Sequence, residues 1–335
     1  MKIAVTGSIA EDYLMTFDGA FSEVIVPEEI ANLSLSFLVD DLTVQRGGVA
    51  ANICFGLGML GQRPLLVGAV GADFQLSYER WLVDHGVDTS AVSVSEDRHT
   101  ARFLCTTDGE ENQIASFYPG AMVEARDVDL QALATGRGGL DLVVIGANDP
   151  EAMVRHRRDA AAAGIEVMAD PSQQLAMLDG EQVRTLVDGA SYLISNEYEA
   201  TLLHRLTGWN DSEMLERVGT RITTRSEKGC VIEQHGEPQL EVPAVPTTQV
   251  ADPTGVGDAF RAGLLTGLGE GLDLERSAQL GSLVAVHAVE VPGPQRYTLQ
   301  PEAAAERFTR AYGQDAARDV APILERVATP APSPA

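Results

Sequence analysis

A glycine-rich stretch at residues 252–258, DPTGVGD, leads directly into a strongly helical run. Glycines at this point allow backbone N–H groups to converge on an anion, and the dipole of the following helix strengthens the same positive field. Asp258, in the first helical turn, is a carboxylate that can accept a proton from a hydroxyl. An anion hole beside a base is the combination that phosphoryl transfer to an alcohol requires.

The same stretch has a simpler explanation, in which it forms an ordinary turn and Asp258 caps a helix. The chain contains no GxxxxGK[ST] sequence, so it is not a P-loop enzyme. The choice between turn and active site therefore depends on what the rest of the chain places beside Asp258.

The overall charge excludes several kinds of partner. The chain has 335 residues, with 24 Lys+Arg against 49 Asp+Glu and a formal net charge of −25. We expect no binding to nucleic acid or to an anionic membrane surface, because both need positive charge. The sequence contains no apolar stretch of about 18 residues, so we expect no membrane-spanning helix. Three separated cysteines and the absence of a signal peptide predict a cytoplasmic protein with buried thiols.

The elements that must position Asp258 follow a regular alternation. Short apolar runs alternate with helical patterns, which predicts an α/β fold whose mostly parallel central sheet is flanked by helices. We expect strands at 3–7, 65–70, 142–146, 165–169, 192–195, 221–224 and 230–233, and helices at 49–60, 78–85, 150–163, 182–187, 197–206, 258–268, 274–289 and 302–312.

Two segments depart from this alternation. Residues 13–46 have an extended or irregular pattern, and residues 98–118 alternate as strands do around a turn at Asp108-Gly109. They predict a small β-sheet lid, and the alternative is that both supply edge strands to one sheet. The expected division is an α/β domain of 1–12, 47–96 and 120–325, a lid of 13–46 and 97–119, and a disordered, Pro/Ala/Ser-rich tail of 326–335.

Four motifs occur in order along the chain: GGVAAN at 47–52, GAVGAD at 68–73, NEYE at 196–199 and DPTGVGD at 252–258. With them the chain resembles the ribokinase-like, pfkB-type carbohydrate kinases, although Pro253 and Val256 stand where that family usually has Thr and Ala. Within the family it is most similar to the bacterial adenosine kinases, through residues 7–12, 34–41, 114–122, 170–174 and 252–258.

This resemblance implies a ribokinase-like fold and ATP-dependent transfer of the γ-phosphoryl to the 5′-hydroxyl of adenosine, giving AMP in purine salvage. It implies that Asp258 is the general base. It also implies that the γ-phosphoryl is held by the N–H groups of Gly255, Val256 and Gly257. Lids of this kind often pair two subunits, so the resemblance further implies a homodimer through the lid.

The resemblance also implies where ATP and its cations bind. Mg²⁺ would be held largely through water near Glu199 and Asn196, and K⁺ is a further candidate cation. The loop expected at the nucleotide comprises Thr224, Arg225, Ser226, Glu227, Lys228 and Gly229. This loop departs from the family, since Ser226 replaces a usual glycine and Arg225 and Glu227 add charge. Arg225 or Lys228 would then be the phosphate partner.

The nucleoside contacts implied by the resemblance come from the N-terminal half and the lid: Ser8, Asp12, Ser36, Gly48, Asn52, Phe103, Phe117 and Gln173. Asp12, Gly48 and Asn52 would bind the ribose hydroxyls, since a carboxylate accepts two hydrogen bonds from a vicinal diol. Phe103 and Phe117 would stack on adenine, and Gln173 would meet its polar edge. Ser8 and Ser36 would add polar contacts.

Each of these residues also has an ordinary structural role to be tested. Asp12 and Gln173 could be loop residues, and the two phenylalanines could be core of the lid. Asn196 and Glu199 could be helix caps. A sugar or another nucleoside is the alternative acceptor. A non-catalytic nucleoside-binding protein on the same fold is a further alternative, against which the retained Asp258 and its glycines argue.

Overall fold

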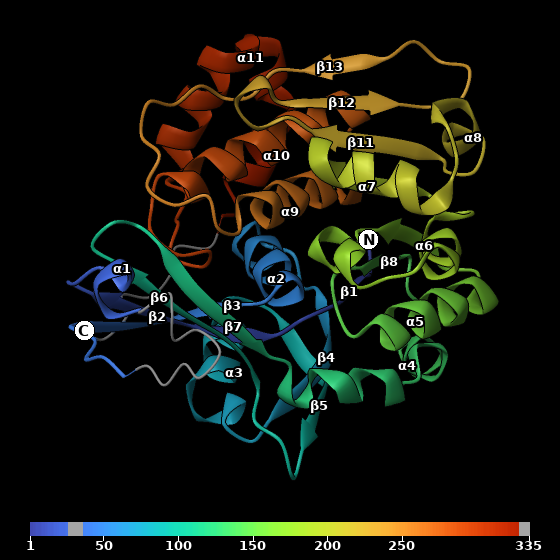
Figure 1. The fold of residues 1–335 in the computed structure, drawn as a ribbon. Helices are drawn as coiled ribbons and strands as arrows, with labels where there is room; N and C mark the ends of the chain where they lie inside the picture. Colours follow the sequence, from blue (N-terminus) through green and yellow to red (C-terminus); the bar gives the residue numbers. More distant parts are fainter. Residues whose placement is uncertain (26–35, 328–335) are drawn as a thin grey trace.

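The computed structural model describes residues 1–25 and 36–327, which form two separate sheets (Figure 1). The larger has nine strands in the order β13-β12-β11-β10-β9-β8-β1-β4-β5. They are β1 (Ile3–Thr6), β4 (Leu65–Gly71), β5 (Asp88–Ser95), β8 (Leu142–Ile145), β9 (Glu166–Ala169), β10 (Tyr192–Asn196), β11 (Thr220–Thr224), β12 (Cys230–Glu233) and β13 (Leu240–Val242). Neighbouring strands from β5 to β11 pair in parallel, and β12 and β13 pair antiparallel. The expected mostly parallel sheet is therefore confirmed.

The strands of this sheet are buried on both faces. Ile3 and Val5 of β1 face one apolar cluster, and Ala4 between them faces the other. The first face is covered by α2 (Val49–Met59), α9 (Val256–Gly269), α10 (Leu274–Val289), α11 (Pro301–Leu324) and part of α3 (Phe74–Asp84). The second face is covered by α4 (Leu130–Gly136), α5 (Pro150–Ala163), α6 (Gly180–Val187), α7 (Glu197–Thr207) and α8 (Asp211–Leu215). Burial on both faces explains why these strands are short apolar runs.

The smaller sheet has four strands in the order β3-β2-β6-β7. They are β2 (Ala10–Phe17), β3 (Asp41–Gly47), β6 (Ala101–Asp108) and β7 (Gln113–Tyr118), with the short α1 (Phe21–Val24) after β2. The predicted hairpin across Asp108-Gly109 is confirmed. The alternative, that both segments are edge strands of a single sheet, is wrong, because β2 pairs with β3 and β6, and β6 pairs with β7, in a sheet separate from the larger one.

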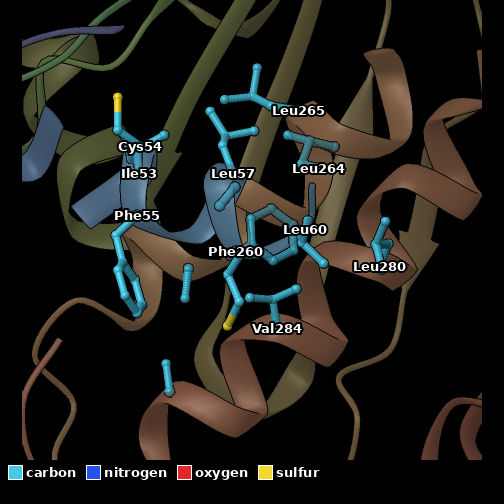
Figure 2. Close-up of a cluster of buried hydrophobic side chains, with 14 of the residues drawn as sticks. Ile53, Cys54, Phe55, Leu57, Leu60, Phe260, Leu264, Leu265, Leu280 and Val284 are labelled. Atoms are coloured by element: carbon cyan, nitrogen blue, oxygen red, sulfur yellow. The ribbon is translucent and has the colours of Figure 1, made fainter. Parts of the chain in front are cut away.

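The interior of the first face is built around α2, all of whose residues are buried. Figure 2 shows Leu57 of α2 beside Leu264 of α9, and Val284 of α10 belongs to the same buried cluster. The helices can approach because small residues lie where they cross. A Cβ on Gly263 of α9 would lie 2.6 Å from the Cα of Gly281 in α10. This packing fixes α9, whose first turn carries Asp258.

Several elements differ from the expectations. The half-exposed strand β5 was not predicted, because its Thr and Ser residues lack an apolar run. α11 extends twelve residues beyond the predicted 302–312, with a break at Gly313, where φ is 88°. Residues 328–335 of the predicted tail, and residues 34 and 35 of the motif at 34–41, lie outside the described residues. Within residues 1–25 and 36–327, no helix is long and apolar enough to cross a membrane.

Candidate active site

A cavity of about 1460 Å³ lies between the small sheet and the carboxyl ends of the strands of the large sheet. That edge of a parallel sheet is where ligands usually bind. The volume exceeds the roughly 300–1,000 Å³ of a site for one small ligand, so it has room for two. Seventeen of the predicted residues line it: Ser8, Asp12, Gly48, Asn52, Phe103, Phe117, Gln173, Asn196, Glu199, Thr224, Ser226, Glu227, Gly229, Gly255, Val256, Gly257 and Asp258.

Three predicted residues are not in the cavity wall. Ser36 is exposed and precedes Phe37, whose ring packs on Phe17 on the small sheet. The guanidinium of Arg225 turns toward Glu241 of β13 at 3.5 Å, and Lys228 is exposed. The opposite charge on the neighbouring strands therefore holds Arg225 away from the position expected for a phosphate partner.

The N-terminus of α9 has the geometry of an anion hole. Gly255 is its N-cap residue, with φ 75° in the left-handed region that favours glycine. A Cβ at this position would also lie 2.3 Å from the Cβ of Pro294. The N–H groups of Val256 and Gly257 belong to the first turn, where a helix leaves N–H groups without intrahelical partners. The N–H of Val256 makes a long bond of 3.4 Å to the carbonyl oxygen of Pro253. These groups and the helix dipole point at the cavity, so they can hold the oxygens of a phosphoryl group.

Asp258 is buried at the middle of the cavity wall, with 9% of its surface exposed. Its Oδ2 accepts a hydrogen bond of 2.8 Å from the side-chain Nδ2 of Asn52. Burial raises the pKa of Asp258 to about 7, against the opposing effects of the Arg261 charge and of the Asn52 hydrogen bond. A base whose pKa lies near neutral pH suits proton abstraction from a hydroxyl.

A buried ion pair lies behind this carboxylate. Arg261, one helical turn after Asp258, forms a two-pronged contact with Asp170, at 2.6 Å for Nη2–Oδ1 and 2.5 Å for Nε–Oδ2. Both side chains are almost fully buried, and Asp170 directly follows β9. The pair was not predicted, although the three-residue spacing of Arg261 from Asp258, which places both on one helix face, was visible in the sequence. It places a positive charge beneath the anion hole.

The small sheet brings a carboxylate and two aromatic rings into one row. In register, Gln45 of β3 pairs with Asp12 of β2, Asp12 with Phe103 of β6, and Phe103 with Phe117 of β7. Residues that pair directly across a sheet point to the same face, which here is the cavity. Gly47 makes room for Asp12, because a Cβ there would lie 2.7 Å from its Oδ2. The row can present a diol-binding group beside flat apolar surfaces.

The pKa of Asp12 is also raised, to about 6, first by burial and then by repulsion from Asp252. The turn that follows β3 is equally constrained. Gly48 has φ 94°, and a Cβ there would lie 2.6 Å from the carbonyl oxygen of Ser8. The Oγ of Ser8 accepts the N–H of Val49, the first residue of α2. Ser8 thus caps α2 as well as lining the cavity.

Asn196 and Glu199 lie at the opposite end of the cavity and form a capping box at the start of α7. Asn196 Oδ1 accepts the N–H of Glu199 at 2.8 Å, and Glu199 Oε2 accepts that of Asn196 at 2.9 Å. The capping role anticipated as an alternative is therefore real. It leaves Oε1 of Glu199 as an anionic ligand at the cavity.

The charges of the cavity wall bear on any bound cation. Among the described residues that line it, five are acidic and one is basic: Asp12, Asp149, Glu199, Glu227, Asp258 and Arg261. The described residues contain no cluster of three His, Cys, Asp or Glu side chains that could enclose a metal ion. One free carboxylate oxygen with few neighbours fits Mg²⁺, which usually keeps several of its waters and takes one or two carboxylates.

Nearly the whole chain is similar to known proteins. A sequence model of the pfkB family carbohydrate kinases matches residues 12–301. The nucleoside kinase of Methanocaldococcus jannaschii is 30% identical over 295 residues, covering 88% of this chain and 92% of that protein.

Solved structures show the same likeness. The nucleoside kinase of Burkholderia thailandensis is 36% identical, and its complex with inosine gives a TM-score of 0.81 over 93% of this chain and 98% of that one. Its complex with ADP-inosine gives 0.79 over 93% and 96%. The ribokinase of Thermotoga maritima, at 19% identity, shares the fold with a TM-score of 0.73 over 92% and 99%. The expected ribokinase-like fold is confirmed.

Proposed function

The chain belongs to the pfkB family of carbohydrate kinases, and we propose that it is an ATP-dependent kinase of purine nucleosides, with adenosine as the predicted acceptor. The observation that carries this proposal is the row of Asp12, Phe103 and Phe117, which faces the same cavity as Asp258. A small sugar needs polar contacts on all sides, whereas two rings beside a carboxylate suit a flat base joined to a ribose diol.

The proposed reaction follows from the order of residues along the cavity. The nucleoside lies against the small sheet with its 5′-hydroxyl at Asp258. As the bond from that oxygen to the γ-phosphorus forms and the bond to the ADP oxygen breaks, the hydroxyl proton passes to Asp258. The N–H groups at Val256 and Gly257 stabilise the charge on the transferring group.

The nucleotide is proposed to lie between the loop 224–229 and α10, where apolar residues line the cavity. Mg²⁺ near Glu199 and Asn196 would supply positive charge to the phosphates. The protein itself offers little, because Arg261 is already paired with Asp170. A requirement for K⁺ and a dimer through the small sheet belong to the same proposal, and both can be tested by omitting KCl and by light scattering.

Adenosine and inosine differ at the 6-position of the base, as an amino donor or an oxygen acceptor. Gln173 lines the same cavity as the two rings, and its amide can both donate and accept. The relative from Burkholderia thailandensis was solved with inosine. Inosine is therefore the second candidate acceptor.

The test is an ADP-release assay with ATP and Mg²⁺ that compares adenosine, inosine, guanosine, ribose and fructose. We expect kcat/KM for one of the purine nucleosides to exceed that for either sugar by at least about a hundredfold. Phe117→Ala should raise the nucleoside KM about fivefold or more, given about 1–3 kcal/mol for a base stacked on a ring. Tyr118→Ala is the matched control, because Tyr118 is the next residue of β7 and points to the opposite face. Preferred turnover of a sugar, or equal effects of the two variants, would contradict the proposal.

A further inference from the structure

Gln295 lies in the segment between α10 and α11 and is 2% exposed. Its amide oxygen and both of its amide N–H groups are engaged. Oε1 accepts the indole N–H of Trp81 at 3.1 Å, while Nε2 donates to Asn52 Oδ1 at 2.9 Å and to Tyr78 Oη at 2.6 Å. An indole nitrogen can only donate, so the amide of Gln295 has one favourable orientation.

This orientation determines that of Asn52. Its Oδ1 must face the donating Nε2 of Gln295, so its own Nδ2 faces Asp258 and donates to Oδ2 at 2.8 Å. The hydrogen bonds therefore run in one direction, from Trp81 to Gln295, then to Asn52, then to Asp258. This direction suits both ends, because the indole can only donate and the ionised carboxylate can only accept. Because Oδ2 is occupied, Oδ1 is the oxygen of Asp258 that is left for the substrate proton.

A second branch leaves the same amide. Tyr78 is fully buried, and its hydroxyl donates to the carbonyl oxygen of Gly47 at 2.7 Å. Gly47 contacts Asp12 and precedes Gly48. The amide of Gln295 is therefore bonded to two side chains, one of which holds Asp258 and the other the Gly47-Gly48 turn.

We propose that Gln295 is a positioning residue, which orients the Asn52 amide toward Oδ2 of Asp258 and holds the Gly47-Gly48 turn through Tyr78. This inference rests on the proposed function, since it assigns Asp258 the role of base. Neither Gln295 nor Trp81 lines the cavity. Their effect passes through Asn52 and Tyr78 alone.

The groups around Asp258 come from five parts of the chain, one of them the segment of Gln295, where the charge of Asp258 adds to burial in raising the pKa of the buried Tyr297. Arg261 of α9 and Asn52 of α2 lower its pKa, whereas Asp170 after β9 and Glu199 of α7 raise it, and burial raises it most. Of these, the Asn52 hydrogen bond alone depends on Gln295. Without Gln295 the Asn52 amide can turn its oxygen toward Asp258. The pKa of Asp258 should then rise further.

The experiment is a titration of Gln295→Met, which keeps the length of the side chain and removes the amide. The Asp258 carboxyl is followed by ¹³C NMR and assigned by its loss in Asp258→Asn. We expect its pKa to rise by about one unit, which is a tenfold change in the protonation equilibrium. Nucleoside kcat/KM should fall about tenfold at pH 6. At pH 9, where Asp258 is ionised, kcat/KM of Gln295→Met should equal that of Tyr78→Phe, which breaks only the connection through Tyr78 to Gly47.

Gln279→Met is the matched control, because Gln279 is 5% exposed and its amide bonds only Arg276 and Glu275 of its own helix. Its Asp258 titration and pH profile should equal those of the wild type. If Gln295→Met does not fold, as judged by circular dichroism, Trp81→Phe removes the indole donor while keeping an aromatic ring against Phe55, and it should shift the titration in the same direction.

An Asp258 titration in Gln295→Met, or in its substitute Trp81→Phe, that matches the wild type would overturn the inference. So would a loss of kcat/KM that is the same at pH 6 and pH 9. The carboxyl readout does not need turnover. A wild-type protein that phosphorylates no nucleoside, with the titration still shifted, would therefore refute the proposed function and leave the orientation of Asp258 by Gln295 supported.

Discussion

Replacing Asp258 by Asn tests the base and its burial together. The side chain keeps its size and loses its ability to accept a proton. Turnover of the nucleoside should fall by about 10²–10⁴, the usual contribution of a general base. Nucleoside affinity, measured by calorimetry, should change little, because Asp12, Phe103 and Phe117 are untouched.

The same substitution should change how stability depends on pH. Burial raises the pKa of Asp258 from 3.8 to about 7. A carboxyl whose pKa is raised by folding contributes stability that is fully present below pH 4 and is lost as the pH rises through 7. The rise of about three units corresponds to at most about 4 kcal/mol. The asparagine introduced by Asp258→Asn would not titrate. The free energy of unfolding of Asp258→Asn relative to wild type should therefore increase by up to this amount between pH 4 and pH 7, and should increase no further above pH 8.

Urea unfolding of both proteins at intervals from pH 4 to pH 9 measures this difference. Asp97→Asn, which neutralises an exposed carboxylate on the loop after β5, controls for the loss of one negative charge. Free energies of unfolding that remain parallel for wild type and Asp258→Asn across this range would refute the reasoning that Asp258 is buried at a cost to the fold. A gain that appears only above pH 8 would equally contradict the stated pKa.

Three further changes have clear expectations. Arg261→Met leaves Asp170 buried without its partner and should lower the free energy of unfolding by about 3–5 kcal/mol in urea, and adding Asp170→Asn should restore part of it. Gly255→Ala would place an alanine at φ 75° with its Cβ 2.3 Å from Pro294. Differential scanning calorimetry should therefore show a lower Tm, and turnover should fall at least about tenfold. As the pH falls through about 6, protonation of Asp12 should raise the nucleoside KM, and a KM for Asp12→Asn that kept this dependence would exclude Asp12 as its source.

Local patterns predicted that Gly255, Gly257 and Asp258 lie together, and the structure places them in the wall of one cavity. The glycines and Asp258 lie within one short stretch, so spacing alone places the anion hole beside the carboxylate. Phe103 and Phe117 were expected on a hairpin, and the hairpin is confirmed. Their alignment with Asp12 could not be read from the sequence, because it depends on the parallel register of β2 with β6.

Contacts between distant parts of the chain were beyond sequence reasoning. Asn52 was expected at the ribose, but its amide bonds Asp258, which lies 206 residues away. Gln295 lies in a segment without helix or strand periodicity, and nothing in its neighbours indicates that its side chain is buried. Arg225 was expected at a phosphate because it adds charge to a loop, and only the antiparallel return through β12 and β13 brings Glu241 close enough to hold it elsewhere.

The complete burial of α2 has a consequence during synthesis. This helix ends at Met59, and α9, against which it packs, begins about 200 residues later at Val256. At about 5–20 residues per second, a ribosome needs roughly 10–40 s to make the intervening chain. During that time the eleven-residue apolar helix α2 is synthesised but α9, against which it packs, is not. The nascent chain is then a ready client for chaperones, and a slowing of translation before Val256 should increase aggregation more than the same slowing after α10.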